Sequence, residues 1–293
     1  MTENKKVIHL AGIIPIAGFE SNFHFLWHDS CMPIAPDYLA VERSVLECAY
    51  AGCETIWIVC NDDMQPLIRH RLGDYVNDPV WIYRPYDYRS SESKKQIPIF
   101  YVPIHPKDRD KRDCLSWSIL YGASSAYGVS SGISKWTSPG KYYVSFPYSV
   151  YPVEFLREHR VEISSKPNFC LTYNNKSVKD NQYTGFTFKP EDFIKFRKNL
   201  REKGTGAYTS NLENGMPREK LSVEERYSAR FFELSDVFDI YNLETKVDLP
   251  WYHPIDNWEN YCAFLSSKER EQIKTPSKDI LSFREMNLIG HDD

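Results

Sequence analysis

The sequence predicts an α/β fold, a three-layer sandwich in which helices cover both faces of a mostly parallel mixed sheet. Apolar runs of strand length alternate with segments of helical periodicity along most of the 293 residues, which is typical of parallel strands joined by crossover helices. The clearest unit comprises the strand Val7–Leu10, the helix Tyr38–Tyr50 and the buried strand Thr55–Cys60. Ligands bind beyond the carboxyl ends of such strands, so the long loop Ala11–Pro36 is expected to form part of any site.

The middle of the chain continues this alternation. The helix of the first unit ends at Gly52, which suits a C-cap, and helical spacing predicts a second helix at Met64–Gly73. Runs of β-branched and aromatic residues predict strands at Val80–Tyr83 and Ile97–Val102. The polar segment Ser90–Lys95 between these two strands is expected to be a solvated loop.

The second half of the chain keeps the same pattern. A helix rich in small residues, which would pack closely on the sheet, is expected at Asp113–Ala126, and Gly128–Gly140 is expected to be a loop. The remaining expected elements are strand Lys141–Phe146, helix Pro152–His159, strands Phe169–Tyr173 and Thr184–Phe188, helix Lys189–Leu200, loop Lys203–Pro217 and helix Val223–Leu234. We expect one α/β domain over residues 1–265 and a peripheral helix and tail over residues 266–293.

Composition excludes several functional classes. The formal net charge is -4 and the pI is about 6.1, so no basic field indicates a nucleic-acid partner. No apolar stretch reaches the roughly 18 residues that a membrane span needs, and we expect a soluble, cytoplasmic protein. The cysteines form no Cys-x-x-Cys pair, and five of them lie in apolar runs, where reduced core thiols are expected. These five are Cys48, Cys53, Cys60, Cys114 and Cys170.

Six pieces of the sequence match the motifs of one protein family in the same order. They are Leu10–Gly12, Met32–Pro36, Leu39–Tyr50, Ala51–Val59, Thr184–Pro190 and Trp251–Tyr261. In order and spacing they resemble the sugar-1-phosphate nucleotidyltransferases, which share a Rossmann-like fold with glycosyltransferases of the A type. The resemblance spans Val7–Leu265, and it depends on the shared order of the pieces rather than on any one of them.

The resemblance implies a reaction and a set of binding residues. The expected reaction transfers a nucleotidyl group from a nucleoside triphosphate to a sugar phosphate or a similar small phosphate, with Mg²⁺ as the cofactor. Asp256, in the last motif, would be the metal ligand. The expected nucleotide-binding residues are Ala11, Gly12, Gly18, Asn61, Asp62, Arg112 and Asp113. No residue is assigned as catalytic.

The sequence departs from the family pattern at the residues that would bind the triphosphate and the metal. The family surrounds the triphosphate with backbone N–H groups, an Arg and a Lys, whereas here Pro15 has no N–H to donate and Glu20 would repel phosphate. No Arg or Lys occurs between Lys6 and Arg43. A second metal carboxylate is expected near Phe146–Ser149, and no acid is there. Either other groups perform the reaction, or it does not take place.

Each candidate residue also has a structural interpretation. Asp256 followed by Glu259 is a capping-box pattern, so Asp256 would cap a helix instead of binding Mg²⁺. Asn61–Asp63 would contact a base, ribose or metal, or would cap the next helix. The charged run Lys107–Arg112, followed by Asp113, would bind phosphate at a helix N-terminus or would be solvated surface. The aromatic residues of the loop Gly12–His28 are typical of a hairpin or lid packed on the sheet.

Three functions follow, in order of preference. The first is the nucleotidyltransferase; the second is a non-catalytic descendant of that fold, used as a binding or assembly module, whose aromatic content suits a protein interface and a homo-oligomer. The third is an A-type glycosyltransferase, for which Asp62–Asp63 is a poor substitute for the Asp-x-Asp pair. All three depend on one spatial expectation: the loop after the first strand and the turn that carries Asp256 face each other across a single cleft.

Overall fold

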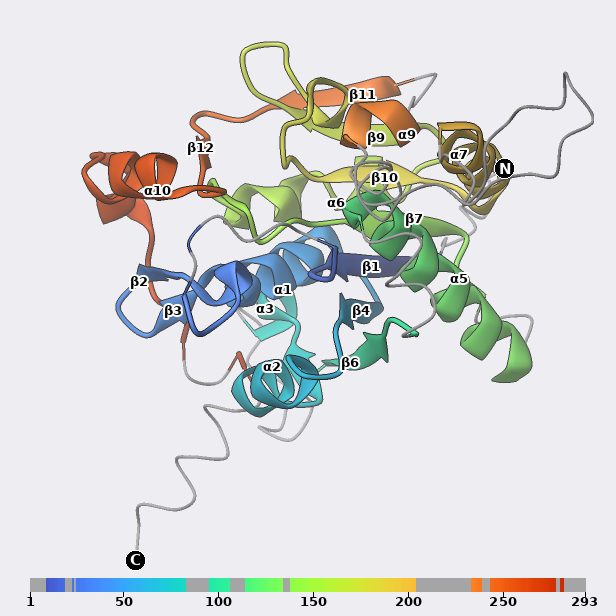
Figure 1. Ribbon diagram of the computed structural model, residues 1–293, viewed down its shortest axis with the longest axis horizontal. Coiled ribbons are helices and arrows are strands. Elements are labelled where there is room, and N and C mark those ends of the chain that lie inside the picture. Colours follow the sequence, from blue (N-terminus) through green and yellow to red (C-terminus); the bar gives the residue numbers. More distant parts are fainter. Residues whose placement is uncertain are drawn as a thin grey trace, which may run out of the picture.

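The computed structural model describes residues 9–18, 23, 25–82, 95–105, 114–133, 138–203, 233–238, 243–277 and 280–281. Within these residues, an eight-stranded sheet has the order β11-β9-β10-β7-β1-β4-β6-β5 (Figure 1). Its strands are β1 (Leu10–Pro15), β4 (Thr55–Cys60), β5 (Tyr75–Asn77), β6 (Gln96–Pro103), β7 (Lys141–Val144), β9 (Asn168–Thr172), β10 (Phe186–Phe188) and β11 (Leu243–Asp248). Strands β5 and β10 run antiparallel to their neighbours, and the other pairs are parallel. The prediction of a mostly parallel mixed sheet is confirmed.

Helices cover both faces of this sheet. On one face lie α1 (Ala40–Ala51), α2 (Gln65–Leu72), α3 (Pro79–Ile82) and α6 (Arg160–Ile163), and on the other lie α5 (Leu115–Ile133), α7 (Pro190–Lys203) and α9 (Leu234–Val237) (Figure 1). Successive side chains of β1 point to opposite faces of the sheet and contribute to the hydrophobic core on each face. Ile14 packs on the α1 side and Ile13 on the α5 side. Both side chains are fully buried, so the predicted three-layer sandwich is also confirmed.

Smaller elements complete the fold. Two short ribbons pair β2 (Pro33–Ala35) with β3 (Tyr38–Leu39) and β8 (Ser149–Val150) with β12 (His253–Pro254). The last helix is α10 (Trp258–Leu265), and the 3₁₀ turns are η1 (Asp29–Cys31), η2 (Glu154–Glu158), η3 (Val178–Asp180) and η4 (Glu269–Gln272).

The first strand lies further along the chain than predicted. β1 begins at Leu10 and continues through Ala11 and Gly12 to Pro15, because the apolar run resumes at Ile13 and Ile14. A Cβ at Gly12 would lie 2.8 Å from the Cys48 sulfur of α1. Glycine therefore permits close packing of α1 on β1, and the loop begins at residue 16.

The predicted strand Val80–Tyr83 is wrong, since α3 occupies Pro79–Ile82. The Asp78 side chain accepts a hydrogen bond from the Val80 N–H at 3.0 Å, and its carbonyl accepts from Trp81 and Ile82. Proline at the first helical position and this cap stabilise a helical turn despite the β-forming side chains.

Other differences concern element ends and edge strands. α5 continues to Ile133, into the predicted loop, β7 stops at Val144, and the predicted helix Pro152–His159 is the turn η2 followed by α6. Strands β5 and β11 were not predicted, because both are short or polar edge strands. The predicted loops Ser90–Lys95 and Lys203–Pro217 and the helix Val223–Leu234 lie largely outside the described residues.

The chain beyond residue 265 returns to the sheet edge. Asn77 of β5 donates its N–H to the Ile280 carbonyl at 2.8 Å, and Leu281 forms a bridge with Val76.

All seven cysteines are free thiols, and the five predicted core cysteines are buried. Among the described helices, none combines the length and hydrophobicity that crossing a bilayer requires.

Candidate functional site

The topology creates one switch point, between β1 and β7. From β1 the chain passes through α1 to β4 on one side, whereas β6 is connected through α5 back to β7 on the other side of β1. Ligands in open α/β sheets bind outside the carboxyl ends of the strands at such a point. The candidate site therefore includes the residues that follow Pro15 of β1 and Val144 of β7.

The loop after β1 is fixed against its neighbours. The N–H groups of Ile16 and Ala17 both donate to the Val59 carbonyl of β4, at 2.8 and 3.0 Å. Ser118 of α5 donates its hydroxyl to the Ala17 carbonyl at 2.5 Å. Gly18 has φ +79°, and a Cβ there would lie 2.5 Å from the carbonyl carbon of Cys114. Glycine thus permits the loop to abut the start of α5.

Two of the predicted nucleotide-binding residues lie inside the sheet. Ala11 is 0% exposed, and Ala11 and Gly12 pair with β4 on one side and β7 on the other. Strand pairing uses the backbone hydrogen-bonding groups of Ala11 and Gly12. Of the predicted residues Ala11, Gly12 and Gly18, only Gly18 lies at the carboxyl edge of the sheet.

A buried ion pair lies beneath the end of β7. Arg43 of α1 donates to Glu47 at 3.0 Å and to the Phe146 carbonyl at 2.6 Å. Its guanidinium also lies 4.4 Å from the centre of the Tyr151 ring. A buried charge requires such partners. The pair therefore fixes the backbone that follows β7.

Hydroxyl groups complete the hydrogen bonding of Glu47. Tyr143 and Tyr151 each donate to its Oε1 at 2.7 Å, and the Ser145 hydroxyl donates to Oε2. Burial raises the pKa of both tyrosines well above the ordinary value, so they remain neutral donors. Tyr151 also accepts the Gly185 N–H at 3.2 Å. This network joins α1, β7 and the residues that precede β10.

His28 faces the same edge from the η1 turn. Its Nδ1 accepts the Ser30 N–H at 3.2 Å, and its ring lies 6.5 Å from that of Tyr148, which follows β7. Burial lowers the pKa of His28, while the negative charges of Asp29 and Asp63 act in the opposite direction. His28 is therefore a mainly neutral side chain between the ends of β4 and β7.

The polar residues after β4 lie at the predicted position. Asn61 accepts the N–H groups of Met64 and Gln65 through its main-chain carbonyl, while its side-chain Oδ1 is buried and has no hydrogen-bond partner within the described residues. Asp62 and Asp63 are exposed. Asp63 Oδ1 accepts the Met64 N–H at 3.1 Å, next to the start of α2. Asn61 thus presents an unsatisfied acceptor at the carboxyl edge.

Asp256 lies beside the end of β7. The ribbon of β8 and β12 brings its turn there, and the Ile255 N–H donates to the Tyr148 carbonyl at 2.9 Å. Asp256 Oδ1 accepts the Asn260 side-chain amide at 2.7 Å and that of Asn257 at 3.3 Å. The capping interpretation of Asp256 is wrong: Asn257 is the N-cap, and its side chain accepts the Asn260 N–H.

The loop after β1 packs against α10, the helix that follows the Asp256 turn, and the single cleft expected between the loop and this turn stays a prediction. The Phe23 ring lies 5.8 Å from Tyr261 and 6.3 Å from Trp258, both in α10. Phe25 stacks on Phe23 at 5.8 Å. The Phe23 and Phe25 rings thus contact α10, whereas packing on the sheet was predicted.

The described residues contain no cluster of metal ligands. Among them, no group of three or more His, Cys, Asp or Glu side chains could hold a metal ion. Asp256 is a single carboxylate oriented by two amides, which suits Mg²⁺ when a substrate phosphate provides further ligands. No acid lies at Phe146–Ser149, where the second metal carboxylate is expected, and Ser145, just before this stretch, donates to Glu47. Arg112 and Asp113 lie outside the described residues, directly before Cys114 and α5.

Sequence reasoning missed two groups at this edge. Tyr148 follows β7 and donates its hydroxyl to the Ile16 carbonyl at 3.0 Å, joining the ends of β7 and β1. The rule that ligand-binding residues follow the carboxyl ends of the strands singled out Asn61 after β4, and it would also have found Tyr148. Arg43 and Glu47 are one turn apart in α1, and their spacing on its apolar face was the available signal.

Comparisons with known proteins agree with this topology. No protein-family model matches the sequence, and no curated protein matches it. A protein described as a glucose-1-phosphate thymidylyltransferase from Bacillus anthracis superimposes with a TM-score of 0.55 and 8% identity, over 92% of this chain and 98% of that chain. An apo UDP-glucose pyrophosphorylase superimposes with a TM-score of 0.51 and 11% identity, over 91% of this chain and 100% of that chain. The chain therefore has a sugar-1-phosphate nucleotidyltransferase-like fold.

Proposed function

We propose that this protein binds a nucleoside triphosphate at the carboxyl edge of β1, β4 and β7 and transfers its nucleotidyl group to a sugar phosphate or similar small phosphate. One observation supports the proposal: at the switch point, Tyr148 after β7 donates to the Ile16 carbonyl of the loop after β1 and accepts the Ile255 N–H beside Asp256. Structural neighbours named for reactions of glucose 1-phosphate and UDP-glucose support this choice of substrate class.

The phosphates would lie near Gly18 and the start of α5. A helix N-terminus has unpaired N–H groups and a positive dipole end, both of which stabilise an anion. Gly18 abuts the residue that precedes this helix, and Arg112 precedes it closely in the sequence. Arg112 would then supply the cation that the loop after β1 lacks.

The nucleoside would lie toward the end of β4. The buried Oδ1 of Asn61 has no partner within the described part of the chain, and an N–H or hydroxyl of a base or ribose would satisfy it. Asp62 is exposed directly beside it. These two residues therefore suit recognition of the nucleoside rather than of the phosphates.

Asp256 would hold Mg²⁺ together with the phosphates of the ligand. Bound Mg²⁺ neutralises charge on a triphosphate during transfer. Asn257 and Asn260 donate to Asp256 Oδ1 and orient its carboxylate. This proposal assigns one protein carboxylate to the ion.

Calorimetric titration with each nucleoside triphosphate tests the proposal. With Mg²⁺ we expect binding of at least one triphosphate, and release of pyrophosphate when glucose 1-phosphate is added. Asp256→Asn should reduce the Mg²⁺-dependent part of the affinity by about tenfold or more, since ionised groups make the stronger contacts. Asp74→Asn, which changes an exposed carboxylate paired with Arg69, is the matched control. No binding at millimolar triphosphate would contradict the proposal.

The second candidate function is a binding or assembly module without catalysis. The observation that favours it is at the end of β7, where Phe146–Ser149 contain no acid for the expected second metal carboxylate and the Phe146 carbonyl accepts from Arg43. This candidate predicts nucleotide binding without pyrophosphate release, or a stable multimer without nucleotide. No feature of the site favours the A-type glycosyltransferase, because Asp62 and Asp63 are adjacent rather than spaced.

A further inference from the structure

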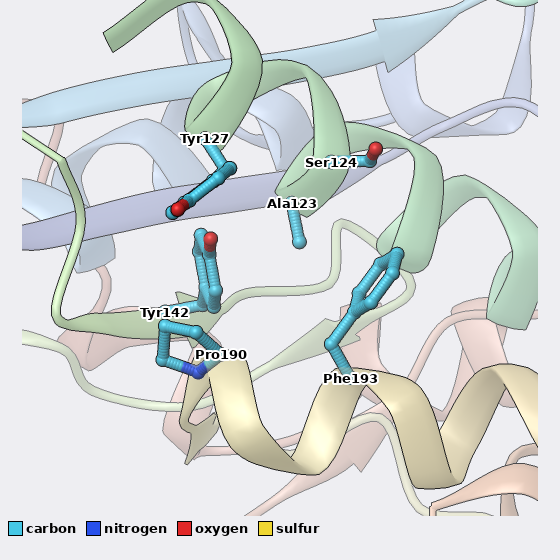
Figure 2. Close-up of a pocket in the computed structure, with 6 residues that line it drawn as sticks. All are labelled: Ala123, Ser124, Tyr127, Tyr142, Pro190 and Phe193. Carbon is cyan, nitrogen blue, oxygen red and sulfur yellow. The ribbon is translucent and has the colours of Figure 1, made fainter. Parts of the chain in front are cut away.

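A pocket lies between α5, α7 and β7, apart from the site described above (Figure 2). Its volume is about 310 Å³, at the lower end of the range for small-molecule sites. It is lined by Ala123, Ser124, Tyr127, Tyr142, Pro190 and Phe193. None of these six lining residues carries a charge.

The pocket and the candidate site lie at opposite ends of β7. Tyr142 is near the start of this strand, and Pro190 begins α7 directly after the antiparallel strand β10. The residues that contact Asp256 and the loop after β1 follow the other end of β7, at Tyr148. A ligand in this pocket would therefore be bound independently of the proposed nucleotide.

Tyr142 has a hydroxyl that is unpaired among the residues that the structure describes. Its side chain is 2% exposed, and its ring packs against Phe188 with centroids 5.0 Å apart. Within the described part of the chain, its only contact of a specific kind is this ring contact, and its hydroxyl makes no hydrogen bond. Burial raises the pKa of Tyr142, so this group remains a protonated donor. The hydroxyl is not among the fully buried polar atoms, so water reaches it, and a ligand in the pocket would accept its hydrogen bond in place of that water.

The walls determine the shape of a suitable ligand. Figure 2 shows the rings of Tyr127 and Tyr142 on one side of the pocket and the ring of Phe193 on the other, with Pro190 below and Ala123 above. Aromatic rings at these positions offer faces and edges to a flat molecule. Since none of the six described lining side chains is charged, they would not compensate a charged ligand for its lost hydration.

We propose that this pocket binds a small, uncharged heteroaromatic molecule that accepts a hydrogen bond from Tyr142. The aromatic walls hold the ring, and the Tyr142 hydroxyl selects a ring nitrogen or carbonyl oxygen. Tyr127, whose side chain is half exposed, lies at the solvent side of the pocket.

Two probes of the same shape test the proposal on the full chain. Quinoline at pH 8 is uncharged and has a ring nitrogen, whereas naphthalene has none. Ligand-observed NMR titration should give a dissociation constant of about 1 mM or below for quinoline, a usual affinity for a ligand of this size. Tyr142→Phe should weaken quinoline about fivefold, as expected for one neutral hydrogen bond, and should change naphthalene binding less than twofold.

Two further variants complete the test. Phe193→Ala removes one wall and should weaken both probes several-fold, while Tyr121→Phe, on α5 outside the pocket, should change neither. Absence of quinoline binding to the wild type would overturn the proposal. Equal weakening of both probes by Tyr142→Phe would also overturn it, because the hydroxyl would then have no role in selection.

Discussion

Tyr261 of α10 donates its hydroxyl to the Pro33 carbonyl at 2.7 Å, joining residues 228 positions apart in the sequence. Tyr261 is 5% exposed, and the Phe23 ring packs against it. This contact holds the helix that follows the Asp256 turn against the segment that follows β1. The two sides of the candidate site therefore have a defined relative position before any ligand binds.

Tyr261→Phe should separate the role of this contact in binding from its role in stability. Loss of one buried hydrogen bond should lower the free energy of unfolding by about 1 kcal/mol and weaken nucleotide binding several-fold. Tyr101→Phe removes a comparable bond, to the Gly73 carbonyl at 2.6 Å, which does not join the loop after β1 to α10. It should cost similar stability in urea unfolding and leave affinity unchanged. Equal affinities for the two variants would mean that the Tyr261 contact is structural only.

Glu47→Gln should be strongly destabilising. The change leaves the Arg43 charge buried without its partner, which costs about 3–5 kcal/mol in comparable pairs. Disruption of the exposed pair between Arg69 and Asp74 by Asp74→Asn should cost below about 1 kcal/mol. Urea unfolding measures both variants, and similar costs for the two would contradict the interpretation of Arg43 and Glu47 as a buried network.

Gly18→Ala and Gly128→Ala should have opposite effects. At Gly18 the new Cβ would meet the Cys114 backbone at 2.5 Å from a left-handed conformation, so we expect a loss of about 1–3 kcal/mol and weaker nucleotide binding. At Gly128, within α5, a Cβ meets nothing within 4 Å, and alanine should add up to about 1 kcal/mol. Thermal and urea unfolding measure whether each variant is less or more stable than the wild type. Neutral behaviour of Gly18→Ala would show that the loop can move away from α5.

His28 should make stability depend on pH. Its folded pKa lies below the ordinary value of 6.5, so the unfolded chain binds more protons between these two values. Stability is then fully present above about pH 6.5 and falls as the pH drops through the folded pKa. His28→Asn keeps an acceptor for the Ser30 N–H and should flatten this part of the profile, while His70→Asn on α2 should not. If the stability of His28→Asn fell more steeply with decreasing pH than that of the wild type, His28 would not be the source of this pH dependence.

Much of the fold could be predicted because its central strands are strongly apolar. The runs at Thr55–Cys60 and Ile97–Val102 and the helical spacing of α1 identified the parallel core. Edge strands were missed, since β11 alternates with charged residues and β5 is only three residues long. The helix α3 was mistaken for a strand, because a proline and the Asp78 cap outweigh the β-propensity of Val80 and Trp81.

The candidate site could be predicted only in part. Chain order and the strand-end rule placed Asn61, Asp62 and Gly18 at the carboxyl edge, and the position of Asp256 followed from its motif. The network of Glu47 could not be predicted, because it depends on residues such as Tyr143 and Tyr151 that are distant in sequence. The orientation of Asp256 by side-chain amides likewise needed coordinates, since sequence alone also suited a helix cap.

Hydrogen exchange with and without the tightest-binding nucleoside triphosphate and Mg²⁺ tests the central claim most directly. The account predicts slower exchange at Ile16–Gly18, at Tyr148 and at the Asp256 turn, with little change around Tyr142 and Phe193. Slower exchange confined to the pocket between α5 and α7, or to the amino ends of the parallel strands, would contradict it.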